Sequence, residues 1–155
     1  MANGAELKGL SIKRKSAAKI LIEAKDYENA AYMMGICLEL ALKAAACKTL
    51  RLEIYPESSD SEDSYFKSHK FDRLLRISGL SDLFSVRTIM VNQDAFDNWS
   101  TFTQAFIFAD KEWVAMRYDA KMLATFNKKK VLQLYNALYE DKNSILKVIM
   151  KGRRW

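Results

Sequence analysis

The chain has 155 residues, of which 50% are hydrophobic, and it contains five glycines and one proline. This composition excludes a disordered chain and favours one compact helical domain over residues 1–155, because turn-rich β domains need more glycine and proline. The net charge is +6, and no apolar run near the start or the centre has the length of a signal peptide or a membrane span. We therefore expect a soluble, cytoplasmic protein with no membrane partner.

The first two predicted helices cover residues 5–24 and 26–50. Apolar residues in the first segment recur mostly at three- and four-residue spacing, which predicts an amphipathic helix. Asp26 suits the N-cap of the second helix, so the linker is very short and the two helices must run antiparallel. Between Ala30 and Cys47 the only charged residues are Glu39 and Lys43, which predicts a helix surrounded by protein.

A narrow polar stripe runs along this otherwise apolar second helix. At 100° per residue, Glu28, Tyr32, Glu39 and Lys43 fall within about 60° of one another. Tyr32, Glu39 and Lys43, joined by Arg117 from a later segment, therefore form a candidate ligand-binding groove. Glu39 and Lys43 are also spaced to pair with each other, so a structural ion pair inside the bundle is the alternative.

The positions of cysteine, histidine and glycine exclude several kinds of site. Cys37 and Cys47 are ten residues apart on one predicted helix, about 15 Å, so both are expected to be reduced core thiols. His69 is the only histidine, and no zinc ligand set can be assembled. The glycines form neither a P-loop nor a dinucleotide-binding pattern. We expect no metal and no cofactor.

Residues 56–67 are predicted to form a flexible acidic loop, because Pro56 precedes the sequence ESSDSED. Its acids, among them Asp60, Glu62 and Asp63, lack the ligand spacing of a calcium loop. Ser68 favours the start of a short helix, HKFDRLLRI, that ends before Gly79.

His69 lies at the start of this short helix. It is interpreted as a surface or capping neighbour, with a catalytic base as the alternative, because the sequence places no acid to orient it. The following segment, residues 85–91, is compatible with either a helix or an extended strand, because its residues suit both.

An aromatic stripe marks the next helix, which Asn92 or Asp94 would cap. Its spacing is what packing alone requires, so we expect the stripe to lie in the core and not to stack on bases. The stripe consists of Phe96, Trp99, Phe102, Phe106 and Ile107.

A last long helix follows Asn127 and continues to about residue 150. Lys128, Lys129 and Lys130 lie in its first turn, against the helix dipole, which indicates a negative neighbour. That neighbour is either nucleic acid or an acidic side chain. The basic tail at residues 151–155 is a further candidate contact for RNA, DNA or an acidic partner, or a solvated tail. Together the segments predict an all-α, up-and-down bundle of four main helices plus one or two short helices.

The order of these features resembles the HEPN family of helical, nucleotide- or nucleic-acid-associated prokaryotic domains. The resemblance covers about residues 17–147 and rests on three segments: DYENAAYMMGICLELALKAAA, SHKFDRLL and WVAMRYD. It implies a bundle of four to five helices that is usually a homodimer. Members of the family include RNA-cleaving toxins and partners of small nucleotidyltransferases in toxin–antitoxin or defence systems.

The ribonuclease members of the family carry an arginine that is followed after four to six residues by a histidine. Here Arg117 is followed by YDAKMLATFN, and no histidine comes later. By resemblance we expect a non-nucleolytic module that binds a nucleotide, RNA or a partner such as a separately encoded nucleotidyltransferase. The alternatives are a divergent RNA-cleaving toxin, with Arg117, Tyr118 and His69 as candidate catalytic groups, and a purely structural homodimeric scaffold.

Overall fold

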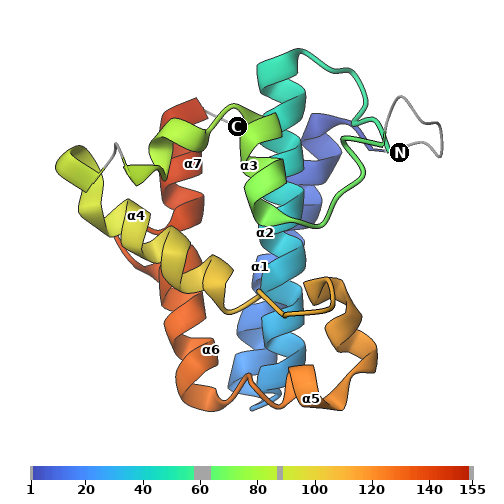
Figure 1. Cartoon of the computed structure of the whole chain (residues 1–155), viewed down its shortest axis with the longest axis vertical. Helices are drawn as coiled ribbons and strands as arrows, with labels where there is room; N and C mark the ends of the chain where they lie inside the picture. The colour runs from blue at the N-terminus through green and yellow to red at the C-terminus, as the bar shows by residue number, and fades with distance from the viewer. Residues whose placement is uncertain (1, 58–63, 87–88, 154–155) are drawn as a thin grey trace.

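The computed structural model of the chain describes residues 2–57, 64–86 and 89–153. Within these residues there are seven α-helices and no strand, which confirms the predicted all-α bundle (Figure 1). Three segments for which the sequence makes a prediction fall partly outside the described residues: the acids of the 56–67 loop, part of 85–91, and the end of the basic tail.

Helices α1 (Gly4–Glu23) and α2 (Tyr27–Leu50) form an antiparallel pair, as predicted (Figure 1). Asn3 and Glu6 cap α1 reciprocally, each side chain accepting a hydrogen bond from the other's backbone N–H. The predicted cap of α2 is confirmed, because the Asp26 carboxylate accepts a hydrogen bond from the backbone N–H of Asn29. Lys25 makes the tight reversal between the helices with a left-handed φ of 62°.

Helix α2 is the core helix of the molecule, as its composition predicts. Its side chains from Ala41 to Cys47 are all buried, and α1, α3 and α6 pack against it. Cys37 and Cys47 are buried free thiols, and burial raises the pKa of Cys37 to about 11. By length and composition α2 could cross a membrane, but 78% of its apolar stretch is buried inside the protein. The core helix of a soluble protein passes the same test.

Helix α3 (Phe71–Ser78) packs on α2 and starts two residues later than predicted. Ser68 does not cap it directly; its hydroxyl instead accepts a hydrogen bond from the backbone N–H of Lys70. The helix ends at Gly79, as expected, where φ is 74°. A Cβ there would lie 2.7 Å from Thr49 Cγ2, so glycine is required by both conformation and space.

A short 3-10 turn, η2 (Ser81–Leu83), precedes α4 (Ile89–Gln104). Helix α4 is kinked at Asn92, whose side chain accepts a hydrogen bond from the backbone N–H of Ala95, so the predicted Asn92 cap is present. The stripe residues Trp99, Phe102 and Phe106 are buried in the core, as predicted, whereas Phe96 is only half-buried. Ile107 is 69% exposed, because α4 has already ended at Gln104.

The predicted long C-terminal helix is wrong in one respect: it is interrupted between residues 140 and 145. The Asp141 carboxylate accepts a hydrogen bond from the backbone N–H of Asn143, which favours a turn over a further helical turn. Figure 1 shows α6 and α7 stacked along one column that α4 crosses obliquely. The segments of this half are η4 (Trp113–Tyr118), α5 (Ala120–Leu123), α6 (Lys128–Tyr135), the π-helical η5 (Asn136–Glu140) and α7 (Ile145–Arg153).

The main helices are therefore α1, α2, α4 and the α6–α7 column, with more short helical segments around them than the one or two expected. The described ends of the acidic loop are held in place. Tyr55 is 1% exposed and donates a hydrogen bond to the carbonyl of Phe66, while Glu57 pairs with Lys43 of α2.

Candidate functional site

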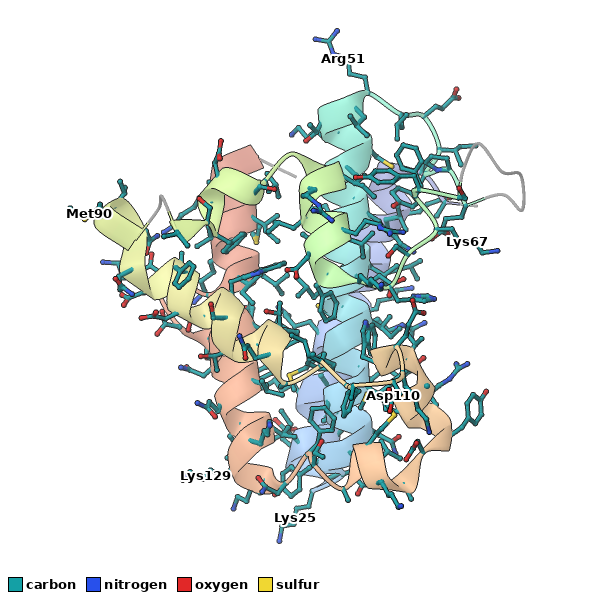
Figure 2. The ribbon with its side chains drawn as sticks, in the orientation of Figure 1. Lys25, Arg51, Lys67, Met90, Asp110 and Lys129 are labelled. Carbon is teal, nitrogen blue, oxygen red and sulfur yellow. The ribbon has the colours of Figure 1, made fainter. Side chains whose placement is uncertain are left out.

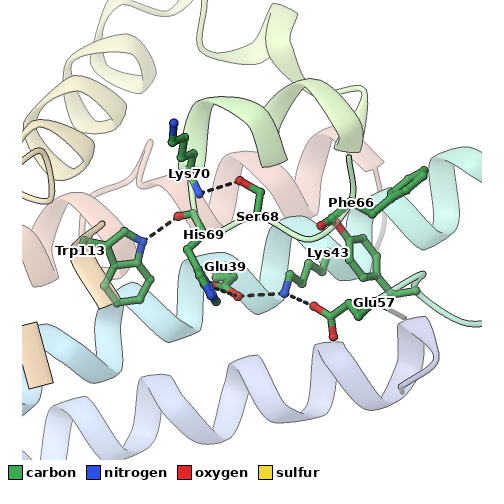
Figure 3. A network of polar contacts seen from close by, with 9 residues as sticks. Glu39, Lys43, Glu57, Phe66, Ser68, His69, Lys70 and Trp113 are labelled. Atoms are coloured by element: carbon green, nitrogen blue, oxygen red, sulfur yellow. Dashed lines mark hydrogen bonds and ion pairs between the residues drawn. The ribbon is translucent and has the colours of Figure 1, made fainter. Parts of the chain in front are cut away.

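The polar stripe of α2 carries a buried ion-pair network. Lys43 Nζ lies 2.8 Å from Glu39 Oε1, and both side chains are only 7% exposed (Figure 3). Lys43 also pairs with Glu57, which comes from the segment after α2. The predicted alternative of an ion pair is thus present. Because two carboxylates already neutralise the Lys43 ammonium, it is not available to a phosphate in this arrangement.

His69 joins this network from the segment that leads into α3. Its Nδ1 lies 2.9 Å from Glu39 Oε2 and 3.1 Å from Oε1, while its backbone carbonyl accepts a hydrogen bond of 2.7 Å from the indole N–H of Trp113 (Figure 3). The sequence places no acid beside His69, but the fold brings one to it. Glu39 orients it across thirty residues of sequence, a distance that no local pattern spans.

The three charged groups at the centre of the network shift one another's pKa. For Glu39, burial alone would raise the pKa, but hydrogen bonds from His69 and Lys43 lower it overall. The hydrogen bond to Glu39 raises the pKa of His69. Burial alone would lower the pKa of Lys43, but its two carboxylate partners raise it overall. All three shifts favour an ionised Glu39 between two cations.

Among the described residues, Arg117 contacts this region through aromatic rings. Its guanidinium lies 5.6 Å from the ring of Tyr32 and 5.0 Å from the ring of Tyr118. Tyr32 in turn lies 5.8 Å from the ring of Trp113, which is bonded to His69. The predicted groove residues thus fall into two pairs, Tyr32 with Arg117 and Glu39 with Lys43, and they do not line one shared surface of charged contacts.

The lysines of the first turn of α6 lie elsewhere. Figure 2 places Lys129 at the same end of the molecule as Lys25, at the bottom of the view. Asn127 caps α6 by accepting a hydrogen bond from the backbone N–H of Lys130. Lys128 and Lys129 are exposed, and within the described residues none of the three lysines forms an ion pair. No acidic neighbour accounts for their position there.

A cleft of about 610 Å³ opens beside His69, between α3 and the segment that joins α4 to η4. We call it the α3 cleft. Its α3 wall carries Lys70, Arg73 and Arg76, which form no ion pair with any described residue. The opposite wall is mixed in charge and comes from residues 107–113, around the labelled Asp110 of Figure 2. Sequence reasoning did not identify this cleft.

Aromatic side chains form the base of the α3 cleft. The rings of Phe71 and Trp113 are stacked at 5.4 Å with an interplanar angle of 20°, and Phe106 meets both at 5.6 and 5.5 Å. Trp113 also connects the base to His69 through its indole N–H. The cleft and the Glu39 network therefore share two residues, His69 and Trp113, and belong to one site.

This site lacks a metal-binding donor set, since no three His, Cys, Asp or Glu side chains gather to hold an ion in the described part of the chain. What it offers is a basic wall, an aromatic base and one histidine held by a carboxylate. The signal for the basic wall was present in the sequence, because positions 70, 73 and 76 recur at helical spacing on the polar face of α3.

Comparison of the chain with known protein families, with curated proteins and with solved structures finds no match. The resemblance to HEPN domains therefore stays a prediction.

Proposed function

We propose that this protein is a HEPN-like module that binds RNA or a nucleotide by its phosphates in the α3 cleft and does not cleave it. By resemblance, it would serve as a component of a nucleotidyltransferase-linked toxin–antitoxin or defence system. The observation that carries the proposal is the row of Lys70, Arg73 and Arg76 along one wall of a cleft with an aromatic base.

The shape and chemistry of the cleft support a phosphate ligand. Its volume of about 610 Å³ is in the range of small-ligand sites. Arginine is suited to phosphate because its guanidinium donates two parallel hydrogen bonds. Asp72, Asp110 and Glu112 also line the cleft, so the net charge is low and we expect micromolar affinity at low salt.

Two features support the proposal that RNA is not cleaved. The sequence lacks the Arg-x4-6-His motif, and Arg117 contacts the rings of Tyr32 and Tyr118 instead of His69. Lys43 cannot stabilise a developing charge on RNA because Glu39 and Glu57 neutralise it.

The test is binding of a rhodamine-labelled oligouridine to the full-length protein, followed by fluorescence anisotropy at several salt concentrations. The double variant Arg73→Ala/Arg76→Ala should weaken binding and reduce the slope of log K against log salt by about 1.4, which corresponds to two lost phosphate contacts. The control is Lys13→Ala/Arg14→Ala on α1, which removes the same charge from another face. Equal losses in both variants would show general charge attraction and contradict the cleft as the site.

The same RNA serves to test for cleavage. After incubation without metal ions it should remain intact on a denaturing gel. Metal-independent cleavage that disappears in both Arg117→Ala and His69→Ala would overturn the proposal in favour of the RNA-cleaving alternative.

One observation favours the alternative of a structural scaffold. At the start of α4, Met90 is 93% exposed and Val91 is 88% exposed, with the exposed Val86 nearby in sequence. Apolar side chains gathered on a surface are typical of protein–protein contacts. Because of the resemblance to HEPN domains, we propose that the protein is a homodimer. Sedimentation velocity of the Met90→Glu variant tests whether this apolar face forms the dimer interface. An RNA-inert dimer would support the scaffold over the binding module.

A further inference from the structure

We propose that His69, in its imidazolium form, is the switchable cation of the α3 cleft, so that the site holds a phosphodiester at mildly acidic pH and releases it as the pH rises. The inference rests on the proposed function and adds to it a specific contact and its regulation. It is carried by the position of His69, which both lines the cleft and bonds to the buried Glu39.

The hydrogen bond to Glu39 decides which imidazole nitrogen a ligand would meet. An ionised carboxylate can only accept hydrogen bonds, so Nδ1 of His69 carries the proton that Glu39 accepts. Nε2 has no hydrogen-bond partner among the described residues, and the side chain is 43% exposed. Nε2 is therefore the ligand-facing nitrogen of the pair.

Protonation reverses the character of this nitrogen. In the neutral ring with a proton on Nδ1, Nε2 is an acceptor with a lone pair, which repels a phosphate oxygen. In the imidazolium ring, Nε2 becomes a charged donor, which attracts the same oxygen. One proton thus converts an unfavourable contact into a charge-assisted hydrogen bond, without any movement of the chain.

On balance the surroundings of His69 favour its protonated form, because Glu39 and Glu112 raise its pKa more than burial and Lys43 lower it. Glu39 and Lys43 approach from α2, Glu112 from the residue before η4, and Glu57 pairs with Lys43 behind them. Lys70, Arg73 and Asp72 come from the α3 side, and Asp110 and Lys111 from the opposite wall. The hydrogen bond to Glu39 raises the pKa of His69. None of these neighbours is a histidine, so His69 is the group whose ordinary titration lies near neutrality.

The experiment measures oligouridine affinity of the full-length protein between about pH 5.5 and about pH 8, a range that brackets histidine titration while the phosphodiester charge stays constant and uracil stays almost entirely neutral. A 5′-hydroxyl RNA with a rhodamine label avoids titration of a terminal phosphate or of the dye. We expect the affinity to fall about tenfold as the pH rises across this range, which corresponds to the loss of one charge-assisted hydrogen bond. By linkage, saturating RNA should raise the His69 pKa by about one unit.

Because His69 is the only histidine, its ring protons give one NMR titration that needs no assignment by mutation. Glu39→Gln should move the midpoints of the NMR titration and of the affinity curve to lower pH. His69→Gln should abolish the pH dependence of RNA affinity and leave weaker binding. If Glu39→Gln does not fold, the NMR titration of the wild-type protein with and without RNA decides the question.

The outcomes separate this inference from the proposed function. RNA binding that is independent of pH, or a His69 pKa that RNA leaves unchanged, would overturn the role of His69 and leave the cleft proposal standing. No binding at any pH would overturn both.

Discussion

Gly35 on α2 leaves room for the ring of Trp113. A Cβ at this position would lie 2.6 Å from Trp113 Cζ3 and 3.1 Å from Phe106 Cε1, both in the aromatic base of the α3 cleft. The indole of Trp113 in turn holds the carbonyl of His69. The absence of one methyl group on α2 therefore helps to set the position of the cleft histidine.

We predict that Gly35→Ala lowers the free energy of unfolding by about 1–3 kcal/mol, because the added methyl group overpacks rigid rings. Urea unfolding measures the change. The control is Gly9→Ala on α1, where a Cβ would meet no atom within 4 Å. This control should stabilise the protein by about 0.5–1 kcal/mol, as expected for an exposed helical position. A Gly35→Ala protein as stable as the Gly9→Ala protein would contradict the packing argument.

Single residues of the site were predictable only where the sequence signal is local. Glu39 and Lys43 are four residues apart on one helix, and the pairing that this spacing allows is present. Glu57 and His69 reach the same network from 14 and 30 residues away, respectively. Such contacts depend on how α3 and the preceding segment fold back on α2, which no helical periodicity encodes.

At the scale of elements, Asn143 ties the break between η5 and α7 to the start of α4. Its side-chain oxygen accepts a hydrogen bond of 3.3 Å from Asn92, and its side-chain nitrogen lies 3.4 Å from an Asp94 oxygen. Its backbone carbonyl accepts a hydrogen bond from Asn98. The interruption of the C-terminal column is thus the point where α4 is attached.

We predict that Asn143→Ala costs about 1 kcal/mol and speeds amide hydrogen exchange in residues 92–99, because two side-chain hydrogen bonds to α4 are lost. Hydrogen exchange with mass spectrometry measures the effect. The neighbouring exposed Lys142 provides the control, and Lys142→Ala should leave exchange in α4 unchanged. Unaltered protection of 92–99 in Asn143→Ala would show that α4 is held by its apolar face alone.

Helix boundaries followed the sequence where a cap or a glycine marks them. Asp26 begins α2, and Gly79 ends α3. The C-terminal column was predicted as one helix because its apolar spacing continues through both α6 and α7. The sequence DKNS between them favours a turn, but the apolar pattern on either side outweighed that signal.

For the whole molecule, the ion-pair network predicts a stability maximum at mildly acidic pH. The pKa of His69 is raised on folding, so its contribution is fully present below its unfolded pKa and is lost as the pH rises through the folded value. The pKa of Glu39 is lowered, so its contribution is present above its unfolded pKa and is lost as the pH falls through the folded value. Both contributions are complete only between the unfolded pKa values of glutamate and histidine.

Urea unfolding across this range should show a fall of about 1 kcal/mol on the alkaline side, a modest figure because His69 is partly exposed. His69→Gln should remove this alkaline decline and leave the decline at acid pH. A wild-type curve that is flat through the histidine range would contradict the coupling between His69 and Glu39.

The bundle as a whole was predictable from composition and helical periodicity, whereas the cleft was not. Its walls come from α3 and from an irregular connection, and their separation is set by the stacked rings of Phe71 and Trp113. Irregular segments carry no periodic signal, so their position relative to a helix follows only from the complete fold.

The bond between His69 and Glu39 also fixes where α3 sits along the length of α2. A slide of α3 by one helical turn would displace the imidazole by about 5.4 Å and leave the buried Glu39 carboxylate with Lys43 as its remaining partner. Apolar contacts alone tolerate such slippage, since one aliphatic ridge resembles the next. The hydrogen bond between His69 and Glu39 therefore favours one position of α3 along α2. That position also places Lys70, Arg73 and Arg76 opposite residues 107–113.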